Sequence, residues 1–303
     1  MHPQRSEVEY YKSLTAAVDE RIADALGQCG QDTLRTALLG IMQGGKRIRP
    51  LLALASARAA GGCEEEAVGA AAAVELLHTS SLIHDDIMDH SSLRRGRPAI
   101  HTLHGVPLAI LAGDALVAIA FRLIHSVSSP RKEDIVTEFT NAFLELCEGQ
   151  ALDLRLAEEI DTGASDHHRM VEQKTAKLFE AAAAIGALTA TSDAGIIRAL
   201  RVFGLHVGMA YQAKDDLLDA VGIPQVLGKP VGNDSKNGRQ TYLKLAHPQR
   251  ISATITSVAA VGNVASTVWE FTDRAIRALD GVPEGPAREH LKLLATSLAE
   301  RSL

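Results

Sequence analysis

Apolar residues recur at three- and four-residue spacing along most of the chain, which is the pattern of amphipathic helices. Helical segments are predicted at residues 5–30, 32–44, 51–60, 65–90, 107–127, 133–159, 165–191 and 193–220, and again from 248 onward with a break at 281–286. No segment shows the alternation that is typical of strands. The pattern predicts an all-α fold, a single-domain bundle of roughly ten or more helices over residues 1–303, with the functional loops at one end.

Composition narrows the class of protein. The chain has 303 residues, 46% of them hydrophobic, and a formal net charge of −6, which argues against a nucleic-acid surface. Charges are spread over residues 1–19, so no signal peptide is expected, and no uncharged apolar run is long enough for a transmembrane segment. Cys29, Cys63 and Cys147 lack metal or redox spacing, which favours a cytoplasmic protein.

An acidic cluster ends the predicted helix at 65–90. Asp85 and Asp89 lie one helical turn apart, with Asp86 beside them. Like charges at this spacing destabilise a helix by a few tenths of a kcal/mol. The cluster is either a solvated helix end or a site that binds a cation.

A second acidic cluster favours the cation site. Asp215, Asp216 and Asp219 repeat the spacing of the first cluster, again after an apolar helical run. Mg²⁺ in proteins is commonly held by one or two carboxylates together with substrate phosphates. The two clusters therefore predict a polyanion that is bound through Mg²⁺.

Three basic segments suit the same polyanion. Gly44–Pro50 combines two glycines with three cations, a composition that fits an anion near a helix N-terminus. Residues 91–98 carry three arginines directly after the first cluster, and residues 228–239 form a charged, glycine-rich segment able to close over a ligand. An ordinary basic turn or a solvated loop is the alternative for each.

Two polar pairs inside apolar helices are ambiguous. Lys174 and Thr175 stand among apolar residues, and Gly149-Gln150 lies one turn before Asp153. Lys174 could extend its ammonium group to solvent without any further role.

The apolar turns before the first cluster predict a pocket for a hydrocarbon tail. Ser81 and Ser80 lie four and five residues before Asp85, and Leu77 lies eight before it. At ~5.4 Å per turn, these side chains stand about one and two turns deeper than the carboxylates.

Taken together, these motifs resemble those of trans-isoprenyl diphosphate synthases, the polyprenyl synthetase family. The matching motifs occur in family order as GGKRIRP at 44–50, HDDIMD at 84–89, RRGRP at 94–98, AILAGDAL at 109–116, GQ at 149–150 with Asp153, KT at 174–175, QAKDDLLD at 212–219 and GKPVGND at 228–234. The resemblance covers about residues 40 to 242 and implies the isoprenoid synthase type of fold, with a central substrate cavity.

The resemblance implies a condensation of isopentenyl diphosphate with an allylic diphosphate. Mg²⁺, three ions per active site with Mn²⁺ able to substitute, would be held by Asp85, Asp89 and Asp215, with Asp86 and Asp216 as further catalytic residues. Isopentenyl diphosphate would be bound by Lys46, Arg49, His78 and Arg95, and the allylic diphosphate by Arg94, Lys174, Lys229 and Arg239. The Thr175 carbonyl and Gln212 would place dipoles near the developing cation. The family usually has Lys in place of Arg239.

Product length is expected to depend on the residues below the first cluster. In the family, a large side chain four or five residues before the first Asp stops the growing tail early. Ser80 and Ser81 are small, so Leu77, Val117 and Phe121 are the expected stoppers and geranylgeranyl diphosphate (C20) is the expected product. A product of C25 or longer is the alternative.

The resemblance also implies a homodimer, and the nearly uncharged helix at 107–127 is the expected contact. Two other functions share the fold. A class I terpene cyclase would have a different second metal motif, and a non-catalytic partner subunit would lack one acidic cluster.

Overall fold

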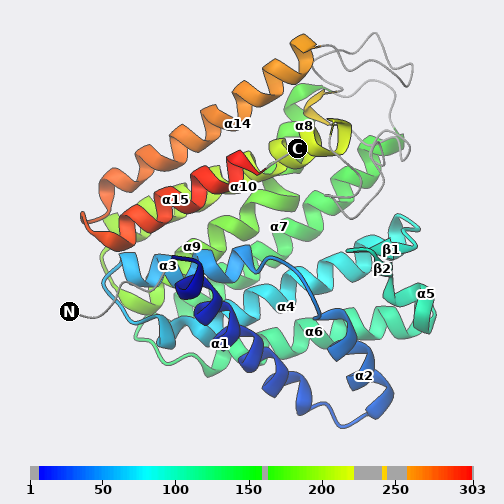
Figure 1. Ribbon diagram of the computed structural model, residues 1–303. Coiled ribbons are helices and arrows are strands. Elements are labelled where there is room, and N and C mark those ends of the chain that lie inside the picture. The colour runs from blue at the N-terminus through cyan, green and yellow to red at the C-terminus, as the bar shows by residue number, and fades with distance from the viewer. Residues whose placement is uncertain (1–6, 159–162, 222–240, 244–257, 302–303) are drawn as a thin grey trace. The chain divides into compact units, whose positions relative to one another are not determined.

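The computed structural model describes residues 7–158, 163–221, 241–243 and 258–301 (Figure 1). Contacts divide the chain into two compact units. Unit 1 comprises residues 1–140 and 182–197, and unit 2 comprises residues 141–181 and 198–303. The prediction of one domain over 1–303 stays a prediction.

In unit 1, α4 is the central helix. The helices of this unit are α1 (Glu7–Gly27), α2 (Asp32–Ile41), α3 (Ile48–Ala59), α4 (Glu64–Met88), α5 (Ile100–His104), α6 (Val106–Ser126) and the first part of α7 (Lys132–Glu158). α4 packs along both α3 and α6 (Figure 1). Its face is lined with alanines and with Leu76 and Leu77, all fully buried, so the helices approach closely.

The C-terminal part of α9 (Lys177–Ala190) also belongs to unit 1 and lies against α3. A Cβ atom on Gly186 would lie 2.0 Å from the carbonyl oxygen of Ala53, and one on Gly62 would lie 2.4 Å from the Cβ of Ala190. Glycine at both positions is therefore a requirement of packing.

Unit 2 contains the rest of α7 and α9, together with α8 (Ala164–Val171), a wide π-helical turn η1 (Glu172–Ala176), α10 (Ala194–Val221, from Arg198 onward), α14 (Val258–Ala278), η2 (Leu279–Gly281) and α15 (Pro286–Glu300). α14 and α15 run side by side (Figure 1). The hydrophobic core of unit 2 includes Met170, Val171, Met209 and Phe271.

The all-α fold is confirmed, and the described ends of the predicted helices lie within a few residues of the expected positions; the predicted start at 248 lies outside the described residues. Three details differ. Residues 100–104, for which the sequence predicts no helix, form the short helix α5. Residues 91–98, predicted as a loop, contain a two-stranded hairpin of β1 (Leu93–Arg94) and β2 (Arg97–Pro98). The helix predicted at 165–191 is interrupted by η1.

Helix α6 is long and apolar enough to cross a membrane by length and composition alone. Its mean hydropathy reaches 1.9, and 44% of the most apolar window is buried inside the protein. Val106, Ile110 and Leu111 are exposed. The expectation that no segment spans a membrane stays a prediction.

Candidate functional site

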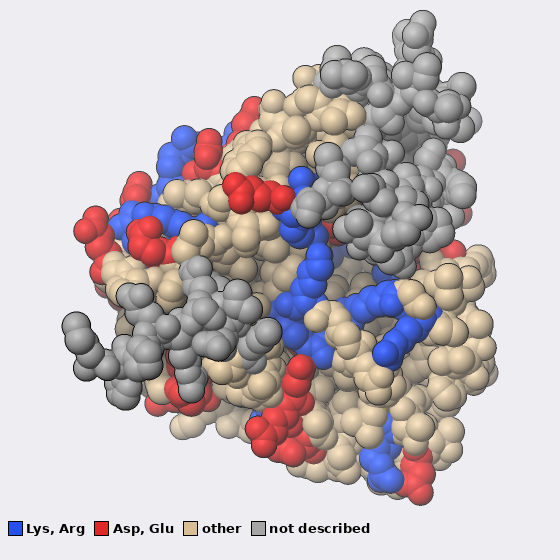
Figure 2. Space-filling model, in the orientation of Figure 1, with Lys and Arg blue, Asp and Glu red and all other residues tan. Residues whose placement is uncertain are grey.

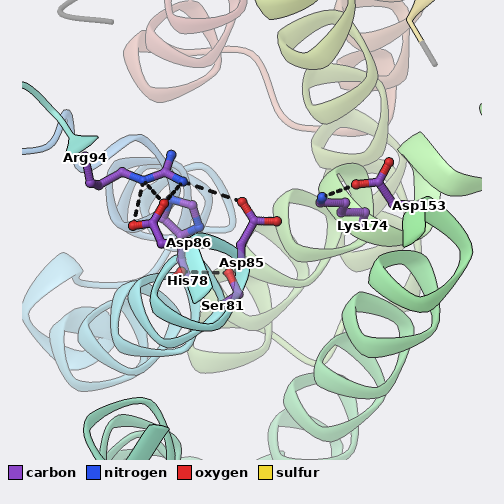
Figure 3. Close-up of polar contacts among 7 residues, drawn as sticks. All are labelled: His78, Ser81, Asp85, Asp86, Arg94, Asp153 and Lys174. Carbon is purple, nitrogen blue, oxygen red and sulfur yellow. Dashed lines mark hydrogen bonds and ion pairs between the residues drawn. The ribbon is translucent and has the colours of Figure 1, made fainter. Parts of the chain in front are cut away.

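The first acidic cluster lies at the C-terminal end of α4, where its three carboxylates differ in environment. Asp86 is 1% exposed, whereas Asp85 and Asp89 are half-buried. The guanidinium of Arg94 faces Asp86, with Nε 2.9 Å from Oδ1, and its Nη2 lies 3.5 Å from Asp85 (Figure 3). Burial raises the pKa of Asp86, and Arg94 opposes that rise. The buried carboxylate thus holds the arginine beside its two more open neighbours.

The β1–β2 hairpin places the next arginine. Its two-residue turn has both central residues at positive φ, 53° at Arg95 and 73° at Gly96, which matches the twist of a tight hairpin. Arg95 Nη1 donates a hydrogen bond of 3.0 Å to the carbonyl oxygen of Gly44. Gly45 beside it has a φ of 98°, a backbone conformation that favours glycine. The hairpin and the Gly44–Pro50 segment therefore form one basic wall.

Arg47 of the same segment points inward. It precedes α3 in a left-handed conformation, and its Nη1 lies 2.9 Å from Glu75 of α4. Its Nε donates to Asp19 at 2.7 Å and its Nη2 to the Met42 carbonyl at 2.6 Å. Although burial lowers the pKa of Arg47, its pairing with Glu75 and Asp19 gives a net rise. Arg47 anchors the loop rather than presenting charge to a ligand.

The exposed cation of this segment is Lys46. Arg49, at the start of α3, is buried, with 8% of its surface exposed. Figure 2 shows Lys and Arg side chains gathered in the part of the face where Figure 1 draws the chain between α2 and α3. An anion can be bound there although the whole chain is acidic.

His78 lies on α4, two turns before Asp85, and is partly buried. Burial and then the positive charges of Arg49, Arg95, Arg94 and Arg47 lower the pKa of His78 well below its usual value. The imidazole is therefore neutral at pH 7 and can donate or accept a hydrogen bond without adding charge.

The predicted tail-binding positions follow on the same helix. Leu77 is fully buried, Ser80 is 1% exposed, and Ser81 donates a hydrogen bond of 2.7 Å to the His78 carbonyl. Phe121 of α6 is half-buried and packs edge-to-face on Phe139 of α7, with ring centroids 5.1 Å apart. The small hydroxyl groups leave the turn below Asp85 without a bulky side chain.

In unit 2, the second acidic cluster lies near the end of α10. Asp215 has a side chain that is 37% exposed, and its Oδ1 lies 3.1 Å from Nη2 of Arg301. Asp216 and Asp219 are 4% and 3% exposed. Arg301 follows α15, in a region where the sequence shows no motif, so sequence reasoning missed it.

The wide turn η1 presents Lys174 and Thr175. Gln173 donates to Glu145 and Glu148 at 3.0 and 2.9 Å, and Lys174 Nζ lies 2.5 Å from Asp153 (Figure 3). A Cβ on Gly149 would lie 2.2 Å from the backbone nitrogen of Lys174. The GQ motif of α7 and the KT motif of η1 thus meet in one close contact.

A chain of hydrogen bonds links η1 to the second cluster. Thr175 Oγ1 donates to Gln212 Oε1 at 2.9 Å, and Gln212 Nε2 donates to Asp216 Oδ1 at 2.8 Å. The backbone nitrogen of Tyr242 donates to the other oxygen of Asp216 at 2.9 Å. Burial and the Asp216 charge raise the pKa of the Tyr242 phenol.

The structure therefore places the predicted site residues in two groups. Unit 1 holds Lys46, Arg49, His78, Asp85, Asp86, Asp89, Arg94 and Arg95, and unit 2 holds Lys174, Thr175, Gln212, Asp215 and Asp216. Lys229 and Arg239 lie outside the described residues.

The donor set fits a hard divalent cation. Asp85 and Asp89 stand one turn apart on α4, and carboxylate oxygens are ligands that Mg²⁺ prefers. Within the described residues, no group of three or more potential ligand side chains converges on one point.

Comparison with known proteins identifies the family. Residues 31–260 match the family model for polyprenyl synthetases. The chain is similar to the short chain isoprenyl diphosphate synthase of Methanothermobacter thermautotrophicus, with 40% identity over 247 residues, 81% of this chain and 76% of that protein. It is 33% identical to the geranylgeranyl pyrophosphate synthase of Geoglobus acetivorans over 315 residues, 97% of this chain and 98% of that protein.

Solved structures of related proteins have a similar fold. Geranylgeranyl pyrophosphate synthetase from Pyrococcus horikoshii superimposes with a TM-score of 0.90 at 32% identity, over 97% of this chain and 98% of that one. Polyprenyl synthase from Caulobacter crescentus, complexed with calcium and isoprenyl diphosphate, gives 0.89 at 30% identity, over 98% and 97%. The chain belongs to the polyprenyl synthetase family and is a trans-prenyltransferase.

Proposed function

We propose that the protein condenses isopentenyl diphosphate with an allylic diphosphate to give geranylgeranyl diphosphate, using Mg²⁺ held by Asp85, Asp89 and Asp215. The main observation in support of the proposal is that basic and acidic side chains lie in contact in unit 1. Arg94 pairs with Asp86 and lies 3.5 Å from the more open Asp85, and its neighbour Arg95 bonds the Gly44 carbonyl. The product names of the relatives support the chain length.

The basic groups divide between two diphosphates in this proposal. Lys46, Arg49, Arg95 and the neutral His78 bind isopentenyl diphosphate. Arg94 and Lys174, with Lys229 and Arg239 from outside the described residues, bind the allylic diphosphate. Arg94 and Arg95 of the hairpin are anchored to a carboxylate and a carbonyl group, so little side-chain entropy remains to be lost on binding.

In the proposed reaction, diphosphate leaves the allylic substrate, and the allylic cation that forms must be stabilised. Bound Mg²⁺ would act as a Lewis acid on the leaving group. The double bond of isopentenyl diphosphate attacks the allylic carbon, and the lost proton passes to the departing diphosphate. Gln212 and Thr175 supply dipoles that are fixed in place before charge develops.

Ser80 and Ser81 support a product longer than C15, because neither fills the turn below the first cluster. Leu77 and, from α6, Val117 and Phe121 are the proposed stoppers. A C25 product would mean that the tail passes all three.

Further features complete the proposal. Three Mg²⁺ ions occupy each site, and Mn²⁺ can replace them.

The protein forms a homodimer through α6, as the exposed Val106, Ile110 and Leu111 support. A cytoplasmic location fits the free thiols of Cys29, Cys63 and Cys147.

The test is incubation of the purified protein with isopentenyl diphosphate and geranyl or farnesyl diphosphate, in Mg²⁺ or in EDTA, followed by chromatography of the products. We expect Mg²⁺-dependent diphosphate release and a C20 product. Asp85→Ala should lower kcat by about 10³-fold or more. Glu66→Ala, an exposed acid on the same helix, is the control and should leave kcat unchanged.

Other results would contradict the proposal. A cyclic hydrocarbon formed from one allylic diphosphate would indicate a terpene cyclase. Activity that appears only after addition of another chain would indicate a partner subunit.

A further inference from the structure

Asp215 and Asp216 are neighbours in sequence but differ in environment. Asp215 has a side chain that is 37% exposed, whereas Asp216 is 4% exposed. Both oxygens of Asp216 already accept hydrogen bonds, one from the Gln212 amide and one from the Tyr242 backbone. A carboxylate held in this way is poorly placed to bind a metal ion.

The charge of Asp216 determines which way Gln212 faces. An ionised carboxylate only accepts hydrogen bonds, so the amide nitrogen of Gln212 must point toward it. The amide oxygen then points toward Thr175, whose Oγ1 lies 2.9 Å away and must donate its proton. The lone pairs of the Thr175 hydroxyl are consequently turned away from Gln212.

The position of Thr175 is fixed independently of these bonds. The wide turn η1 is pressed against Gly149, and Gln173 and Lys174 on the same turn are each bound to acidic side chains of α7. Thr175 itself is 9% exposed. Only the direction of its hydroxyl group remains to be determined.

We propose that Asp216 is a positioning residue that fixes the direction of the hydrogen-bond chain through Gln212, so that Thr175 presents oxygen lone pairs to the allylic substrate. The assignment rests on the proposed function, in which positive charge develops on that substrate. Lone pairs directed at a forming cation stabilise it, whereas a hydroxyl proton would repel it. Asp215 remains the carboxylate for the metal.

Asp216→Asn tests this directly. The Asn oxygen can accept from Tyr242, and its amide then donates to Gln212, which must turn over and donate to Thr175. We expect the fold to be kept, the Mg²⁺ concentration for half-maximal rate to stay within about twofold, and kcat to fall on the order of tenfold. Asp215→Asn is the matched control and should raise the Mg²⁺ requirement about tenfold or more.

The double variant Gln212→Glu/Asp216→Asn restores the original direction, because the introduced carboxylate would again accept from Thr175. We expect it to recover most of the kcat that Asp216→Asn loses. In a Thr175→Val background, which lacks the hydroxyl, Asp216→Asn should cause no further loss of kcat.

Two results would overturn the proposal. One is a rise in the Mg²⁺ requirement of Asp216→Asn equal to that of Asp215→Asn, which would make Asp216 a metal ligand. The other is a double variant as slow as, or slower than, Asp216→Asn. Urea unfolding provides a readout without substrate: the double variant should be more stable than Gln212→Glu alone, which places two carboxylates together. The urea result does not depend on which reaction the protein catalyses. A failure of this proposal can therefore be distinguished from a failure of the proposed function.

Discussion

Arg301 pairs with Asp215, with 3.1 Å between Nη2 and Oδ1, and its guanidinium lies 4.1 Å from the ring centre of Tyr211. Its Nε also donates to the Leu298 carbonyl at 3.1 Å. The carboxylate that we assign to the metal is thus already neutralised by a cation that follows the last helix. A metal ion at Asp215 must compete with this arginine.

Arg301→Ala should therefore lower the Mg²⁺ concentration needed for half-maximal rate by several-fold, since the competitor is gone. The free energy of unfolding in EDTA should fall by about 1 kcal/mol, because the stacking on Tyr211 and the partly exposed ion pair are both lost. Mg²⁺ titration of the rate and urea unfolding measure the two effects. Arg301→Lys is the control and should retain the competition. A higher Mg²⁺ requirement in Arg301→Ala would contradict the assignment.

Arg47 and Glu75 form a buried ion pair, with side chains 7% and 3% exposed. Removing one partner leaves a buried charge, so Arg47→Met should lower the free energy of unfolding by about 3 kcal/mol. Because Lys46 directly precedes Arg47 and Arg49 lies in the first turn of α3, KM for isopentenyl diphosphate should rise more than KM for the allylic substrate. The variant Arg47→Met/Glu75→Leu should be more stable than Arg47→Met, and chemical denaturation tests this. Additive losses would show that the two charges do not depend on each other.

Gly149→Ala should disturb the turn that carries Lys174 and Thr175, because the new methyl group would meet the Lys174 backbone nitrogen. We expect a loss of about 1–3 kcal/mol in the free energy of unfolding, together with a lower kcat. Gly69→Ala is the matched control within α4, where nothing lies within 4 Å of an added Cβ. That change should stabilise the protein by about 0.5–1 kcal/mol. Equal stabilities of the two variants, measured by urea unfolding, would refute the contact.

His78 should make stability depend on pH. Its pKa is lowered on folding, so the unfolded chain binds the proton first and the free energy of unfolding falls as pH drops below about 6.5. Each pH unit in that range can remove up to about 1.4 kcal/mol. Thermal melts of the protein and of His78→Gln between pH 5 and 8 should show a smaller slope for the variant. His206, whose pKa burial also lowers, accounts for part of the slope that remains. Parallel curves would mean that His78 does not titrate in this way.

Ser80→Phe should shorten the main product toward C15, since the ring would fill the space of the fourth isoprene unit. Ser80 is 1% exposed, so some loss of stability, about 1–3 kcal/mol, is also expected. Chromatography of the products gives the length. Ser81→Ala, which removes only the bond to the His78 carbonyl, is the control and should leave the length unchanged. An unaltered product from Ser80→Phe would show that the tail does not run along this face of α4.

The helices and the two acidic clusters could be predicted because their signals are local. Apolar periodicity placed α4 and α10 within a few residues, and the repeated Asp spacing marked both ends. The hairpin at Arg95 and Gly96 was missed because two-residue strands leave no alternating pattern. The wide turn η1 was missed because one wider turn hardly changes the apolar spacing, and its close contact with Gly149 joins residues that are distant in sequence.

The sequence was also a poor guide to which way some charged side chains point. The sequence predicts that Lys46 and Arg49 of Gly44–Pro50 bind an anion and assigns no role to Arg47, which turns inward to Glu75, 28 residues away. A signal for this did exist, since Glu75 is an isolated acid in an apolar helical stretch and needs a buried partner. For Arg301 there was none, because a single arginine after an amphipathic helix has no distinguishing pattern.

The left-handed backbone at Arg95 has a consequence for how this chain can evolve. In the described part of the chain, Arg47, His90 and Arg95 are the residues other than glycine with positive φ; His90 and Arg95 follow the first acidic cluster, and Arg47 lies in the other half of the basic wall. Each such conformation costs about 1 kcal/mol relative to glycine. At Arg95, selection for heat resistance alone would favour Gly or Asn and would remove an arginine that shapes the basic wall, whereas Arg47 is retained by its buried ion pair with Glu75. Thermostable variants that keep turnover must therefore acquire their gains elsewhere, in the alanine-lined packing of α3, α4 and α6 or on the far surfaces of the helices.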